Sequence, residues 1–270
     1  MCRAVDTVTK ESVLLREVRF LDEQNAVPAN LVREISLLKE IKSRYILRLL
    51  NVVTSDRWNG LCLVYESLNY NLRALLSNPR GRALSLDIIK IYLHQILCAV
   101  AFLHSHKIVH RDLKPENLFV DLHKHILKVG DLGLGRALGG SFEITPNDPT
   151  GSRYMAPELL FNTKEYSCEV DIWSVGCIFA EMTKMYLFFN ASIMGLPNEE
   201  TWPGVNEVHP FLHCYTKTEP QDLRSLLPLG PDGFDLILRM LCMYPKGRIR
   251  AIDALEHPFF DSIPLSQRQQ

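Results

Sequence analysis

The chain has 270 residues, is 47% hydrophobic and carries a formal net charge of -1, with a pI near 6.8. This composition predicts one or two compact domains and argues against a general nucleic-acid or membrane-surface binder, which needs a basic face. The seven scattered cysteines form no Cys-x-x-Cys pair, which favours reduced, mostly buried thiols in the nucleus or cytoplasm over metal ligands.

The sequence contains no pattern typical of a secretory or membrane-spanning segment. Residues 1–6 have no apolar signal region. The longest apolar stretch, residues 172–180, is interrupted by Ser174 and Gly176. It is far shorter than the roughly 20 residues that a membrane span requires. We therefore expect a soluble protein with neither membrane nor nucleic acid as a partner.

The first part of the chain combines predicted strands with one predicted helix. Residues 12–20 and 61–65 have the apolar, β-branched character of strands. Between them, Leu31, Ile35 and Leu38 recur at helical spacing, and Asn30 is a candidate N-cap. This part is expected to form a small strand-rich lobe.

Helical periodicity dominates after residue 85. Helices are expected at residues 88–103, 166–185, 234–242 and 252–257. Two short apolar runs, residues 118–120 and 126–129, suit a small two-stranded ribbon. The whole pattern predicts an α+β fold in which a small β-rich lobe precedes a larger α-helical lobe.

Three motifs carry residues suited to chemistry. Residues 110–117 read His-Arg-Asp-Leu-Lys-Pro-Glu-Asn, residues 131–133 read Asp-Leu-Gly, and residues 155–158 read Met-Ala-Pro-Glu. In this order they resemble the catalytic loop, the metal-binding motif and the end of the activation segment of eukaryotic protein kinases.

The resemblance covers nearly the whole chain and implies a bilobal protein-kinase-like fold. The kinase domain would occupy residues 1–263, with a partial N-lobe at 1–67, a C-lobe at 68–263 and a C-terminal tail at 264–270. The implied reaction transfers the γ-phosphate of ATP, with Mg²⁺ as the metal.

By this resemblance, each polar residue of the motifs has a role. Asp112 would orient the substrate hydroxyl and Lys114 would contact the γ-phosphate. Asn117 and Asp131 would ligate Mg²⁺, which prefers hard oxygen ligands. A lysine two residues after Asp112 is similar to serine/threonine kinases rather than tyrosine kinases.

Other positions would line the ATP site. Arg16 occupies the place of the strand lysine that orients the phosphates, and Glu34 the place of its partner on a helix. The positions around the adenine would be Tyr65 as gatekeeper, the backbone of Glu66 and Leu68, and Phe119 as the floor.

Within the kinases, the chain most closely resembles the cyclin-dependent subfamily. Residues 28–34, Pro-Ala-Asn-Leu-Val-Arg-Glu, align without gaps with the helix that cyclins bind, and residues 131–136 resemble plant B-type members. The implied partners are a cyclin-like subunit, held through the helix at 28–41, and protein substrates containing Ser/Thr-Pro. The implied process is cell-cycle control. An ordinary amphipathic helix is the alternative for residues 28–41.

The resemblance also implies an arginine cluster for an activation-segment phosphate. Arg33, Arg111 and Arg136 fall at its three positions, and arginine binds phosphate through charge-assisted bonds. Pro146 stands where relatives have the phosphorylated threonine. Thr145 is therefore either a displaced phosphosite or part of a turn.

The sequence departs from the kinase pattern chiefly at the ATP site. No glycine precedes Gly60, so by this resemblance we expect the first strands and the glycine-rich loop of the N-lobe to be absent from this sequence. Arg16 replaces a lysine, and Leu14 replaces an alanine over the adenine. Gly151 replaces a threonine near the catalytic loop, and the region at 188–195 is shorter. These departures leave three alternatives: an active kinase, a pseudokinase that binds a cyclin or substrate, or an incomplete gene model of an active kinase.

Overall fold

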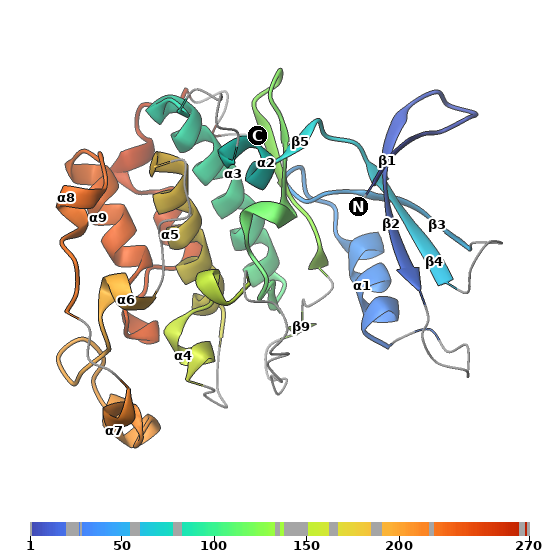
Figure 1. Cartoon of the computed structure of the whole chain (residues 1–270). Coiled ribbons are helices and arrows are strands. Elements are labelled where there is room, and N and C mark those ends of the chain that lie inside the picture. Colours follow the sequence, from blue (N-terminus) through green and yellow to red (C-terminus); the bar gives the residue numbers. More distant parts are fainter. Residues whose placement is uncertain are drawn as a thin grey trace.

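A computed structural model describes residues 2–19, 27, 29–54, 60–77, 83–132, 136–137, 151–161, 167–184, 191–215, 219–264 and 268. The chain forms a small strand-rich lobe and a larger helical lobe that lie side by side (Figure 1). They are joined where β4 (Gly60–Glu66) leads to β5 (Tyr70–Asn71) and α2 (Leu72–Leu76). The predicted α+β, two-lobed architecture is confirmed.

The small lobe is an antiparallel sheet with one helix packed beside it. Within the described residues, the sheet has four strands in the order β1-β2-β4-β3. The helix, α1 (Ala29–Glu40), buries Leu31 and Leu38. The strands are β1 (Cys2–Val5), β2 (Ser12–Arg19), β3 (Leu49–Thr54) and β4. Helix α1 begins at Ala29, so the prediction of Asn30 as its N-cap is wrong.

The pairing of β2 with β4 determines which side chains of the small lobe share a face of the sheet. Leu14 pairs with Tyr65, and Arg16 pairs with Leu63. Because alternate residues of a strand share a face, Leu14 and Arg16 lie on one side of the sheet. Leu14, Leu63 and Tyr65 are buried there together with α1.

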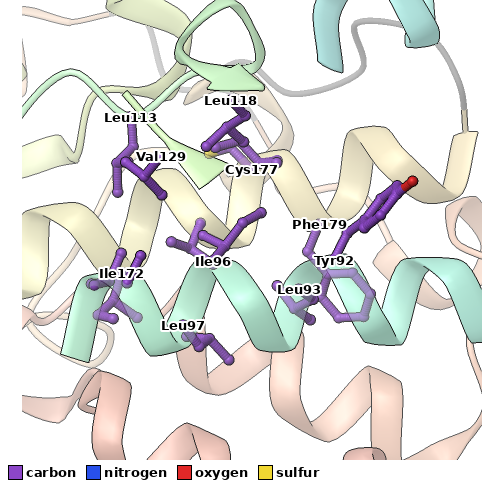
Figure 2. Packing of buried hydrophobic residues seen from close by; sticks show 14 of the residues in the cluster. Tyr92, Leu93, Ile96, Leu97, Leu113, Leu118, Val129, Ile172, Cys177 and Phe179 are labelled. Atoms are coloured by element: carbon purple, nitrogen blue, oxygen red, sulfur yellow. The ribbon is translucent and has the colours of Figure 1, made fainter. Parts of the chain in front are cut away.

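Two long helices form the core of the helical lobe. They are α3 (Leu86–Ser105) and α5 (Glu169–Lys184), which pack against each other. The hydroxyl of Ser85 caps α3 by accepting a bond from the Ile88 amide, 3.3 Å away. Figure 2 shows Ile96 of α3 and Cys177 of α5 in the same apolar cluster as Leu113 and Leu118. The catalytic-loop segment is thus anchored on the core of this lobe.

Helix α3 is long and apolar enough, by length and composition alone, to span a membrane. Most of its apolar side chains are nevertheless packed inside the helical lobe, and the positions from Tyr92 to Leu97 are all buried. Core helices commonly have this composition. The length and hydropathy of α3 are therefore accounted for by its place in the core.

Short strands line the edge of the helical lobe that faces the sheet. The ribbon predicted from two apolar runs is present as β7 (Leu118–Asp121) and β8 (Ile126–Val129). Within the described residues, β5 pairs with β7, so this sheet has three strands rather than the predicted two. A separate pair is formed by β6 (Ile108–Val109) and β9 (Arg136–Ala137). The loop between β6 and β7 carries residues 110–117.

The remaining elements are short and complete the helical lobe. Predicted helices at 234–242 and 252–257 correspond to α9 (Pro231–Met240) and α10 (Ala251–Leu255). The other helices and turns are η1 (Pro115–Asn117), η3 (Gly151–Tyr154), α4 (Pro157–Leu160), α6 (Ala191–Met194), α7 (Val205–Val208), η4 (Leu212–Cys214), α8 (Leu223–Leu226), η5 (Pro245–Gly247) and η6 (Pro258–Phe260).

Candidate active site

The three predicted catalytic residues of the loop at 110–117 lie together. The Asn117 Nδ2 group donates to the backbone oxygen of Asp112 at 2.8 Å and to its Oδ2 at 3.0 Å. The Lys114 Nζ lies 3.0 Å from the Asp112 Oδ1. The Asp112 carboxylate is therefore held between an amide and an ammonium group, and its side chain is 20% exposed.

A buried carboxylate on α5 holds the backbone of this loop. Asp171 accepts bonds from the amides of His110 at 2.9 Å and Arg111 at 2.8 Å, and its Oδ2 lies 2.8 Å from the His104 Nε2. Burial raises the pKa of Asp171, but these bonds and the neighbouring histidines outweigh it and keep the pKa below its usual value. The ionised carboxylate fixes Arg111 in a left-handed conformation, at a φ of 68°.

A second contact joins the loop to the metal-side motif. The His110 Nε2 lies 3.0 Å from the carbonyl oxygen of Gly130, the residue before Asp131. Asp131 has a φ of 62°, which is uncommon for a residue other than glycine. The His110 side chain therefore joins the loop at 110–117 to the chain just before Asp131.

An ion-pair cluster connects the small lobe to Asp131. The Arg16 Nη1 lies 2.6 Å from the Glu34 Oε1 and 3.0 Å from the Asp131 Oδ1. The Tyr65 hydroxyl lies 3.5 Å from the same Glu34 oxygen. Sequence reasoning expected the pair of Arg16 and Glu34, but it gave no signal for the contact of the tyrosine.

Burial and charge shift the pKa values in this cluster. Burial raises the pKa of Glu34 above its usual value, although Arg16 opposes the shift. Burial lowers the pKa of Arg16, but the carboxylates of Asp131 and Glu34 outweigh it and raise the pKa. Burial is also the main reason that the Tyr65 pKa is raised well above its usual value. Arg16 therefore stays cationic.

The segment expected to contact adenine already makes contacts within the chain. The Glu66 carboxylate accepts bonds from the Arg48 amide at 2.8 Å and from the Lys128 Nζ at 2.7 Å. The Arg3 Nη2 donates to the carbonyl oxygen of Leu68 at 3.1 Å and also to that of Asn69. The contact of Arg3 was not predicted, because neither strand periodicity nor the motifs reveal it.

The two apolar side chains expected to flank the adenine are buried. Leu14 and Phe119 are 6% and 7% exposed. A Cβ atom placed on Gly130 would lie 2.7 Å from the Phe119 ring, closer than normal contacts allow. Gly130 is therefore required for the close approach of the ring to the chain just before Asp131.

An unpredicted network surrounds Arg73 of α2. Its Nε lies 2.7 Å from the Glu116 Oε1 and its Nη1 lies 2.5 Å from the Glu181 Oε1. Its Nη2 donates to the Tyr154 hydroxyl, which donates in turn to Glu181 at 2.6 Å. One side chain thereby connects α2, the catalytic loop, the end of the activation segment and α5.

The arginine cluster predicted for an activation-segment phosphate is described only in part. Arg111 is buried, at 9% exposure. Arg33 lies on α1 and Arg136 on β9, but their side chains are outside the described part of the structure. The candidate phosphosite Thr145 also lies outside the described residues.

A buried ion pair supports the end of the activation segment. The Arg248 Nη1 and Nη2 atoms lie 2.7 Å and 3.1 Å from the two oxygens of Glu158. The two side chains are 0% and 3% exposed. Because both side chains are buried, the pair is a structural contact of the core.

The oxygen groups of Asn117 and Asp131 are suited to Mg²⁺. No group of three or more His, Cys, Asp or Glu residues gathers as a metal site among the residues that the structure describes. Mg²⁺ fits such a sparse site, since it commonly uses one or two protein ligands together with phosphates and water. The Nδ2 of Asn117 is taken by Asp112, so its Oδ1 is the atom suited to a metal.

Comparison with known families agrees with this geometry. The family model of the protein kinase domain matches residues 1–260. The chain therefore belongs to the protein kinase family.

Proposed function

We propose that this chain is a serine/threonine protein kinase of the cyclin-dependent type. It would transfer the γ-phosphate of ATP to Ser/Thr-Pro sites in proteins, in the nucleus or cytoplasm, as part of cell-cycle control. The observation that carries the proposal is the arrangement of Asp112, Lys114 and Asn117, together with the ion pair of Arg16 and Glu34. In protein kinases the aspartate of the catalytic loop accepts the proton of the substrate hydroxyl, and a strand lysine paired with a helix glutamate, the positions of Arg16 and Glu34 here, must be in place for transfer.

The residues of the loop support a direct role in transfer. When bound, ATP with Mg²⁺ supplies the phosphoryl group and neutralises part of its charge. Asp112 accepts the hydrogen bond of the substrate hydroxyl and orients it for attack. Lys114, 3.0 Å from Asp112, brings positive charge to the same place. Asn117 keeps the Asp112 carboxylate in position and, with Asp131, would hold the metal.

The small lobe would present the nucleotide to these residues. Arg16 would contact the phosphates and is positioned by Glu34, which is 2% exposed. The backbone of Glu66 and Leu68 would contact the adenine, with Tyr65 behind it and Phe119 below it. These assignments extend the family's roles to matching positions.

Helix α1 supports the proposal of a cyclin-like partner. Leu31 and Leu38 are buried against the lobe, whereas Val32 is 54% exposed. Val32 and Glu34 lie on the same helix. A partner that binds at Val32 could therefore shift the helix and with it the ion pair of Glu34 and Arg16. The sequence of residues 28–34 supplies the resemblance to the cyclin-binding helix.

A phosphate-transfer assay tests the proposed activity. Purified chain, a cyclin and Mg-ATP should phosphorylate a Ser-Pro peptide, and Asp112→Asn should abolish the transfer. The threonine and tyrosine forms of the same peptide test the residue specificity. No transfer in the presence of cyclin would contradict the proposal.

A second candidate is a pseudokinase that binds a cyclin or substrate without turnover. Leu14 is buried where the adenine would bind, and Arg3 engages the Leu68 carbonyl oxygen. Thermal unfolding with Mg-ATP separates the two candidates, because a ligand at 100 times its Kd stabilises by about 2.7 kcal/mol. A clear upward shift of Tm would count against the second candidate.

A further inference from the structure

One nitrogen of Arg16 lies between two carboxylates of the candidate site. Its Nη1 is 2.6 Å from Glu34 and 3.0 Å from Asp131. Asp131 is also the carboxylate suited to a metal ion. The guanidinium of Arg16 is therefore already in contact with the carboxylate that is suited to the metal.

The backbone and burial of the cluster keep the contact in place. Glu34 is 2% exposed and is also approached by the Tyr65 hydroxyl. Asp131 has a left-handed backbone, and the carbonyl of the preceding Gly130 is within hydrogen-bond distance of the His110 ring. These contacts hold the side chain of Glu34 and the backbone of Asp131 beside Arg16.

Arginine differs from lysine in ways that matter here. A guanidinium group is always charged and has five N–H donors in a planar fork. The Nη1 of Arg16 serves both carboxylates and the guanidinium also interacts with the Tyr65 hydroxyl, so the remaining N–H donors of the fork are those that can meet phosphate oxygens. A divalent ion that enters at Asp131 is repelled by this fixed charge, and the repulsion is strong in a partly buried site.

We propose that Arg16 makes nucleotide binding by this chain independent of magnesium. The guanidinium takes over the electrostatic part that a metal ion plays in holding the phosphates, while it occupies the metal-side carboxylate. Phosphate transfer would still use the metal, so affinity and turnover would respond differently to it. This inference rests on the proposed nucleotide site.

Binding of ADP, measured by isothermal titration calorimetry with either EDTA or excess Mg²⁺, tests the proposal without turnover. For the wild-type chain, the two dissociation constants should agree within about threefold. For Arg16→Lys, magnesium should tighten binding by about tenfold or more, because the compact ammonium leaves the Asp131 carboxylate more open to the ion. Arg19→Lys makes the same change on the opposite face of β2, where the side chain is 67% exposed, and should behave as wild type.

The outcomes separate this inference from the proposed function. Wild-type binding that needs magnesium would overturn the inference and leave the kinase assignment standing. Magnesium dependence that is the same in wild type and Arg16→Lys would also overturn it. Absence of ADP binding in both buffers, for both proteins, would overturn the inference and the proposed nucleotide site together.

Discussion

Replacement of Arg248 by Met is expected to destabilise the chain strongly. Arg248 is fully buried and makes two bonds to Glu158, at 2.7 Å and 3.1 Å, and two more to the carbonyl oxygens of Glu169 and Cys242. The variant leaves the Glu158 carboxylate buried without its cation. Removal of one partner of a buried pair costs about 3–5 kcal/mol, a large share of the 5–15 kcal/mol that is typical of unfolding.

Urea denaturation of wild type and variants measures this cost. Arg250→Met is a matched control, because Arg250 also makes a two-pronged pair, with Asp253, at 71% and 46% exposure. Its removal should change the midpoint little, since water replaces the lost contacts. Replacing both Glu158 and Arg248 by apolar residues should recover much of the loss. Equal effects of Arg248→Met and Arg250→Met would refute the reasoning from burial.

Three further changes probe the site. Gly130→Ala should destabilise by about 1–3 kcal/mol in urea, because the Phe119 ring must move, and an unchanged midpoint would show that the ring yields freely. Leu14→Ala should lower stability by about 2–5 kcal/mol yet tighten ADP binding measured by calorimetry; weaker binding would contradict the proposed crowding. Asp171→Asn should lower the free energy of unfolding by about 1.5–3 kcal/mol near neutral pH. Because the pKa of Asp171 is lowered in the folded state, its ionised carboxylate stabilises the fold above about pH 4, and this stabilisation disappears as the pH falls further. The difference in unfolding free energy between wild type and Asp171→Asn should therefore shrink in acid. A difference that stays constant with pH would contradict the assigned ionisation.

The sequence was most informative where chemistry requires particular residues in order. The motif at 110–117 predicted that Asp112, Lys114 and Asn117 lie together, and the structure brings them within hydrogen-bond distance. Hydrophobic periodicity located α3 and α5 within a few residues, because their apolar faces are long and regular. The division into two lobes could therefore be predicted from the sequence.

Contacts between distant segments could not be predicted in the same way. The Arg3 contact with the Leu68 carbonyl and the network of Arg73 depend on how separate elements pack. The third strand of the ribbon, β5, has only two residues, Tyr70–Asn71, which is too short for any period to be detected. The prediction of Asn30 as the N-cap was wrong because the helix already begins at Ala29.

The hydrogen bonds to Asp171 determine whether residues 110–117 could keep their conformation if they were moved into another protein. Two successive amides of the loop are held by a carboxylate that belongs to a core helix. A chimaera that received residues 110–117 alone would inherit the reactive groups without the support that orients them. A transplant that keeps the loop conformation would need to include Asp171 and His104 as well as residues 110–117. The smallest part that could be transferred is therefore the loop together with part of the core.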